Sequence, residues 1–107
     1  MSLGSDILGA AYLVYSEWGP DRRTPRPKRL RNAFPQLTDA DVDSLMSLFK
    51  GVDAVVWELA KKGGDAKIGR EVVRGSLKTD FAFLAGPGLE RAHFLVNYYA
   101  WHEGYST

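Results

Sequence analysis

Residues 37–64 read LTDADVDSLMSLFKGVDAVVWELAKKGG, and this stretch decides the fold class. Large apolar side chains recur in it at steps of three and four residues, at Val42, Leu45, Phe49, Val52, Val56 and Leu59. Because an α-helix turns through about 100° per residue, this spacing places them on one face of a helix. The stretch therefore predicts a helix over residues 38–62 that buries one face in a core.

Both ends of this predicted helix carry residues that helix ends favour. Thr38 can accept a hydrogen bond from a backbone N–H of the first turn, and Asp41 can reciprocate as the second half of a capping box. Acidic residues crowd the start of the helix, whereas the lysine pair at 61–62 lies at its end, as the helix dipole favours. The glycine pair at 63–64 then ends the helix.

Three further segments have helical patterns. Apolar residues in the range 7–18 predict a helix that ends at Gly19-Pro20. Over residues 88–104, apolar side chains surround nearly the whole helix axis, which is typical of a helix at the centre of a bundle or at a subunit interface. Residues 65–85 predict one helix or two short ones, because two glycines weaken the apolar pattern.

A short basic helix is predicted between the first helix and the longest one. Thr24 is expected to be its cap and Pro25 its first helical residue, and the helix should end before Pro35. No run of strand length alternates between apolar and polar residues. We therefore expect an all-α fold, an irregular bundle of four main helices plus this short basic one, in a single domain over residues 1–107.

The composition excludes several chemistries. The 107 residues include no cysteine, so the chain has no disulfide framework, no thiol nucleophile and no thiolate metal site. No stretch approaches the roughly 20 apolar residues of a membrane span, and the start of the chain lacks the layout of a signal peptide. We therefore expect a cytoplasmic protein that does not interact with a membrane.

Positive charge is concentrated in one segment. Residues 21–31 hold six cations against a single acid, Asp21, whereas the whole chain has a net charge of only +1. Such a segment can bind the phosphates of nucleic acid or another polyanion with salt-sensitive affinity. However, it has no interleaved aromatic residues for base stacking, and its arginines can instead bridge acidic parts of the fold or of a partner. The candidate polyanion-binding residues are Arg22, Arg23, Arg26, Lys28, Arg29 and Arg31.

Asp53 is a candidate site residue because of its place on the helix wheel. It falls within the apolar arc of the helix predicted over 38–62, near Trp57. A carboxylate there needs a partner or has a raised pKa, because burying a lone charge is unfavourable. It could act as a general base or as a ligand anchor. We favour the alternative, a structural partner for an arginine, a tyrosine hydroxyl or a tryptophan N–H.

Glu90, His93 and Asn97 form a polar stripe on the otherwise apolar helix predicted over 88–104. The stripe could line a small-molecule cleft in which His93 is an acid–base group. It could equally face solvent or consist of hydrogen-bonded polar groups in the core, and these two interpretations are favoured. An enzyme would need Asp53, His93 and Asn97 to converge on one pocket.

No motif for a metal, a nucleotide or a catalytic triad is complete. His93 and His102 are nine residues apart, which places them on opposite sides of one helix. His102-Glu103 begins like a zinc-protease motif, but Ser106 stands where the second histidine belongs. The chain has no Gly-x-Ser-x-Gly elbow, and the glycines of 63–69 do not have phosphate-loop spacing. We therefore expect no metal ion and no cofactor.

Aromatic residues cluster on the first and last predicted helices. Rings at helical spacing usually belong to a core, but tyrosine and tryptophan also favour interfaces, so the last helix could form a homodimer. We expect a non-enzymatic helical protein-interaction module that can self-associate, with residues 22–31 as a charged contact surface. The alternatives are a polyanion-binding protein that uses this basic segment, and a small enzyme or ligand-binding protein that uses Asp53 and His93.

One string of residues resembles the signature of a family of small, uncharacterised bacterial helical proteins. The resemblance covers residues 17–37 and 98–101. It implies a bacterial origin, and it points to no particular activity because none is known for that family. It supplies no functional residues. The matching positions are Glu17-Trp18-Gly19-Pro20, Arg23, Pro25, Arg29-Leu30, Pro35, Leu37 and Tyr98-Tyr99-Ala100-Trp101.

Overall fold

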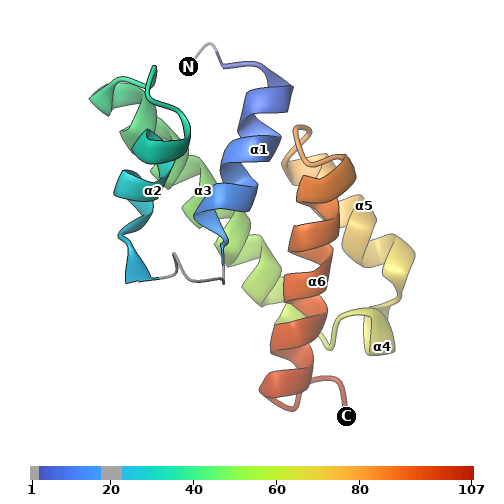
Figure 1. Cartoon of the computed structure of the whole chain (residues 1–107). Coiled ribbons are helices and arrows are strands. Elements are labelled where there is room, and N and C mark those ends of the chain that lie inside the picture. The colour runs from blue at the N-terminus through green and yellow to red at the C-terminus, as the bar shows by residue number, and fades with distance from the viewer. Residues whose placement is uncertain (1–2, 18–22) are drawn as a thin grey trace.

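A computed structural model describes residues 3–17 and 23–107 of the chain. This part of the chain forms six α-helices and no strand, so the predicted all-α fold is confirmed (Figure 1). None of its helices has both the length and the apolar character needed to cross a membrane. The helices are α1 (Ser5–Tyr15), α2 (Arg26–Ala33), α3 (Asp39–Lys61), α4 (Asp65–Ile68), α5 (Arg70–Asp80) and α6 (Gly86–His102).

The longest helix, α3, forms as its sequence predicts. The Thr38 hydroxyl accepts from the Asp41 backbone N–H at 3.1 Å, and the Asp41 carboxylate accepts from the Thr38 backbone N–H at 3.1 Å. The capping box is therefore present, and it satisfies two of the backbone donors that a helix start leaves without partners. All six apolar residues that define the predicted face are buried in the core.

The C-terminal helix α6 has one buried side and one exposed side. It packs against α1, α3 and α5, and Figure 1 shows it between α1 and α5. Its inner side buries Leu89, Leu95 and Val96, whereas Phe94 and Trp101 are exposed on its outer side. The apolar residues that surround the axis of α6 therefore divide into two sets, one buried in the core and one exposed at the surface.

The structure decides one prediction that was left open and moves the boundaries of two predicted helices, and one further boundary lies outside the described residues. The helix predicted over 88–104 spans Gly86–His102, so both of its ends lie two residues earlier than predicted. Residues 65–85 form two helices, α4 and α5, which Gly69 separates in a left-handed conformation with φ +91°. The basic helix α2 begins at Arg26, so the prediction of Pro25 as its first residue is wrong by one position, and Pro25 is its N-cap. Helix α1 ends at Tyr15, and the predicted stop at Gly19-Pro20 lies outside the described residues.

Candidate functional site

Asp53 lies where α1, α2 and α3 meet. Its Oδ2 accepts a hydrogen bond of 2.7 Å from the Tyr15 hydroxyl. Burial raises the pKa of Asp53, while the hydrogen bond from Tyr15 and the positive charge of Arg26 act in the opposite direction. Burial and the Asp53 carboxylate likewise raise the pKa of Tyr15. The tyrosine hydroxyl is therefore the partner that the place of Asp53 on the helix wheel requires.

A cavity of about 250 Å³ opens beside this carboxylate, and its walls are Arg26, Asp53, Trp57 and Tyr99. The rings of Trp57 and Tyr99 are in contact, with centroids 4.9 Å apart. Arg26 and Asp53 form no ion pair within 4.0 Å, although they carry opposite charges on the wall of one cavity. The site therefore combines an acid, a cation and two aromatic rings drawn from α2, α3 and α6.

His93 belongs to a different network, on the side of α6 that faces α4 and α5. Its buried ring places Nε2 2.8 and 2.9 Å from the two Asp65 carboxylate oxygens. Its Nδ1 lies 3.2 Å from Arg74 Nη1, which also donates to Glu90 at 2.8 Å. Because arginine can only donate, His93 Nδ1 accepts a hydrogen bond from Arg74, and His93 Nε2–H donates one to the Asp65 carboxylate.

Asn97 continues this network by one turn of α6. Its Oδ1 accepts from the backbone N–H of Asp65 at 3.0 Å, at the first residue of α4. The predicted polar stripe therefore connects α6 to the two helices that precede it in the chain. In the described part of the chain, Asp53 and His93 have no hydrogen-bond partner in common.

Two arginines of the basic segment bind the end of α1. Arg29 is buried, and its Nη1 donates to the backbone carbonyls of Val14 at 3.3 Å and Glu17 at 3.1 Å. Arg26 Nε donates to the Tyr15 carbonyl at 3.1 Å, and its guanidinium lies 4.4 Å from the centroid of the Tyr15 ring. Cations are favourable at the carbonyl end of a helix, so this part of the segment joins α2 to α1.

The remaining cations of the segment have different surroundings. Arg31 forms an exposed ion pair with Asp39 in the first turn of α3. Arg23 and Lys28 are exposed. Arg22 lies outside the described residues. Within the described part of the segment, three arginines therefore make contacts inside the fold, and two other cations face solvent.

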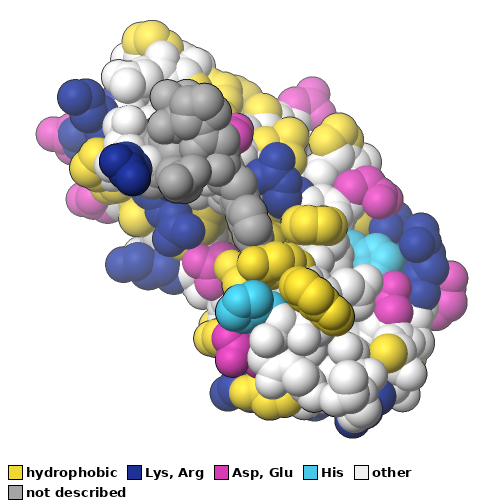
Figure 2. Space-filling view, turned by 60° about the horizontal axis from the view of Figure 1, so that its bottom comes forward, with side chains coloured by type: hydrophobic (Ala, Val, Ile, Leu, Met, Phe, Trp, Pro, Cys, Tyr) yellow, Lys and Arg dark blue, Asp and Glu magenta, His cyan; other side chains and the backbone are white. Residues whose placement is uncertain are grey.

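An aromatic surface covers the outer side of α6. We call Phe94, Tyr98, Trp101 and His102 the aromatic face of α6. The Tyr98 ring is stacked on those of Phe94 and His102, with centroids 6.1 and 5.6 Å apart, and it contacts Trp101 at 6.2 Å. Phe94 is 56% exposed and Trp101 is 70% exposed. Figure 2 shows hydrophobic side chains gathered beside a histidine in the middle of this side of the molecule.

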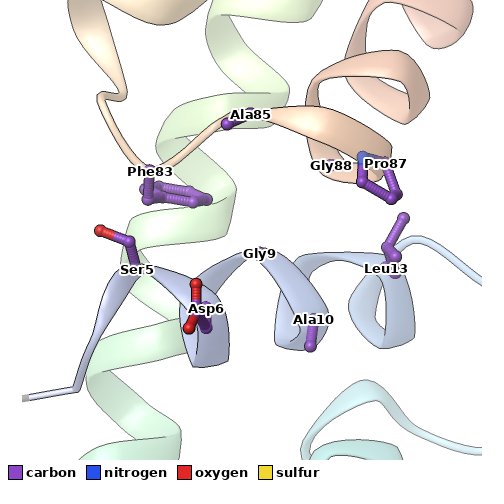
Figure 3. A pocket seen from close by; sticks show the side chains of 9 residues that line it. All are labelled: Ser5, Asp6, Gly9, Ala10, Leu13, Phe83, Ala85, Pro87 and Gly88. Carbon is purple, nitrogen blue, oxygen red and sulfur yellow. The ribbon is translucent and has the colours of Figure 1, made fainter.

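A second cavity, of about 310 Å³, lies between α1 and the start of α6 (Figure 3). The two helices come close here because Gly9 and Gly88 face each other, and a Cβ on Gly88 would lie 3.7 Å from the Gly9 Cα. Ser5 and Asp6 are the polar side chains among the nine residues that line it. Ligand sites usually contain several converging polar groups, which this cavity does not have.

The sequence reasoning missed three residues that organise these networks. Asp65 and Arg74 are the partners of His93. Arg91 donates from Nη1 to the carbonyl and to the hydroxyl of Ser16, both at 2.9 Å, and so attaches α6 to the end of α1. The only local indication was Asp65, an acid that directly follows the glycine pair where a new helix could start.

The two tyrosines of α1 offer a paired test of the Asp53 contact. We expect Tyr15→Phe to destabilise the protein by about 1–2 kcal/mol, because Asp53 loses its donor in a partly buried place. Tyr12→Phe should be neutral or stabilise by up to about 1 kcal/mol, because the buried Tyr12 hydroxyl has no hydrogen-bond partner in the described structure. Urea unfolding of both variants measures the difference. Equal effects would show that the Tyr15–Asp53 contact contributes nothing.

Comparison with known proteins adds no family. No protein-family model, no curated protein and no solved structure matches this chain.

Within the described residues, no group of three or more histidine, aspartate or glutamate side chains could hold a metal ion.

Proposed function

We propose that the protein is a non-enzymatic helical interaction module that self-associates through the aromatic face of α6. The observation that carries the proposal is the exposure of Phe94 and Trp101 on either side of Tyr98. Contiguous exposed apolar surface on a soluble domain marks interaction sites, and aromatic residues are enriched in them. We place this module in the cytoplasm, which the sequence without cysteine fits.

A second copy of this chain is the partner that the spacing favours. Phe94, Tyr98 and Trp101 follow one another at steps of four and three residues, the spacing of a seam between two packed helices. Another copy carries the same seam. If two α6 helices pack antiparallel about a twofold axis near Tyr98, Phe94 lies against the partner's Trp101, and the contact occurs twice.

The exposed area suits a weak dimer. An aromatic side chain buries roughly 150–250 Å² when fully enclosed, so the exposed parts of this face amount to about 400 Å² per copy. Two copies would then bury about 800 Å², slightly less than the roughly 1,000 Å² of a specific interface. Residues beside the face would add to this area, and we expect a dissociation constant of roughly 10–100 µM.

The other candidate residues support an interaction role over catalysis. His93, Glu90 and Asn97 are hydrogen-bonded to neighbouring helices, as structural polar groups usually are. Arg29 is buried against the end of α1, so the basic segment presents one cation fewer at its surface than its composition indicates.

Light scattering coupled to gel filtration, at protein concentrations from about 10 to about 300 µM, tests the dimer. The wild-type mass should rise with concentration, and Trp101→Glu should remain monomeric because it places a charge in the seam, against the Phe94 ring of the second copy. Val72→Glu is the matched control, since Val72 is a 53% exposed apolar residue on α5. A wild-type monomer at the highest concentration, or the same effect of both variants, would exclude this interface.

A further inference from the structure

We infer that the cavity bounded by Arg26, Asp53, Trp57 and Tyr99 binds a small zwitterion, an α-amino acid with an aliphatic side chain. This site lies beside the aromatic face of α6 and does not depend on the proposed self-association.

The two charges of the cavity define the ligand. In the described structure, Asp53 receives its hydrogen bond from Tyr15 on Oδ2, and no arginine or lysine nitrogen lies within 4.0 Å of its carboxylate. Arg26 donates from Nε to the Tyr15 carbonyl, and its terminal nitrogens have no hydrogen bond in the described part of the chain. An ammonium group beside Asp53 and a carboxylate beside Arg26 would give each of these side chains a partner of opposite charge. Such charge-assisted hydrogen bonds are stronger than hydrogen bonds between neutral groups. An α-amino acid carries these two groups on one carbon atom.

Both charged side chains are held in place before a ligand arrives. The Tyr15 hydroxyl fixes the Asp53 carboxylate at 2.7 Å, and the Tyr15 ring and carbonyl together hold the Arg26 guanidinium. Tyr15 itself is buried, so it is a rigid support. A site whose polar groups are already ordered loses less conformational entropy on binding.

The size and the walls of the cavity limit the ligand side chain. A volume of about 250 Å³ corresponds to about eight water molecules, so a ligand of about eight non-hydrogen atoms fits. Valine and leucine have this size, whereas tryptophan is too large. The touching rings of Trp57 and Tyr99 provide an apolar wall for an aliphatic side chain, and their faces also attract an ammonium group. Trp57 is 40% exposed, which leaves the cavity an entrance.

NMR titration with leucine, followed at the backbone amides of α3 and the indole N–H of Trp57, tests the site. We expect saturable shifts with a dissociation constant of about 1 mM, as suits a very small ligand in an open cavity. The probes 4-methylpentanoate and 3-methylbutylamine each lack one charge of leucine, and each should bind at least about 10-fold more weakly.

Two variants connect binding to the residues. Asp53→Asn keeps an oxygen that can accept from Tyr15 but loses the charge, and it should weaken leucine binding by about 10-fold. Asp43→Asn, at an exposed position on the same helix, should leave the affinity unchanged. No saturable shifts with leucine, equal binding of leucine and the two probes, or unchanged affinity in Asp53→Asn would each overturn the inference. The titration is repeated in Trp101→Glu, where loss of self-association should leave leucine binding intact.

Discussion

Replacing Gly64 by alanine is expected to destabilise the protein by about 3 kcal/mol. Gly64 has φ +58° and ψ −148°, a backbone conformation that residues other than glycine rarely adopt. Its added Cβ would lie 2.6 Å from Asn97 Oδ1, and Val96 and Ala100 are also within 3.5 Å. Asn97 would have to move, and the backbone N–H of Asp65 would then lose its acceptor. Backbone strain and the lost hydrogen bond therefore act together.

Gly75→Ala is the matched control for this substitution. Gly75 lies within α5, and a Cβ added there would have no atom within 4 Å beyond its chain neighbours and the backbone of its own helix. Alanine is a better helix former than glycine, so this variant should be more stable than wild type by about 0.5–1 kcal/mol. Urea unfolding of the two variants should therefore give shifts of opposite sign. A loss below about 1 kcal/mol in Gly64→Ala would mean that the loop relaxes and that the Asn97 contact does not hold α4 in place.

Features of the fold that depend on residues close together in the sequence could be predicted from the sequence. The start of α3 follows from Thr38 and Asp41, which are three residues apart and cap each other without help from the rest of the molecule. Its buried face follows from a spacing that any helix would impose. The basic helix was found within one residue because prolines restrict the backbone locally.

Partners across the bundle could not be predicted, because they depend on how helices pack. The place of Asp53 in the apolar arc indicates that it needs a partner, and a tyrosine hydroxyl is one of the three kinds considered, but Tyr15 is 38 residues away in the chain. Asp65 and Arg74 come from the segment with the weakest helical pattern, so nothing local connected them to His93. In each case the sequence indicated a requirement, and only the packing identified the residue that meets it.

The aromatic residues of α6 show a different limit of sequence reasoning. An apolar pattern all round an axis fits a central helix and also an interface helix, since both bury every side. The structure shows α6 in contact with α1, α3 and α5, with Trp101 and Phe94 facing outward. The apolar character of a residue does not tell which side of α6 it lies on. A side chain buried in the core of this chain and one buried against a partner protein are equally apolar.

Arg29 connects the basic segment to the end of α1, and its substitution removes this contact inside the fold. We expect Arg29→Ala to destabilise the protein by about 2–3 kcal/mol, because two carbonyls at the end of α1 lose a charged donor in a buried place. Lys28→Ala, one residue earlier and exposed, should change the stability by less than about 0.5 kcal/mol. Urea unfolding at neutral pH measures both.

The same pair of variants distinguishes a scaffold from a polyanion-binding surface. If α2 is mainly scaffold, Lys28→Ala and the folded fraction of Arg29→Ala should both retain whatever weak affinity the wild type has for a nucleic acid probe. If the segment is a binding surface, Lys28→Ala should lower that affinity although the fold is unchanged. The slope of the logarithm of the binding constant against the logarithm of the salt concentration should then become shallower by about 1, the loss of one phosphate contact. A buried arginine cannot donate to two helix carbonyls and to a phosphate with the same nitrogen. If only Lys28→Ala lowers the affinity for the nucleic acid probe, the outer side of α2 binds the polyanion. The inner side, which holds Arg29, then stabilises the fold.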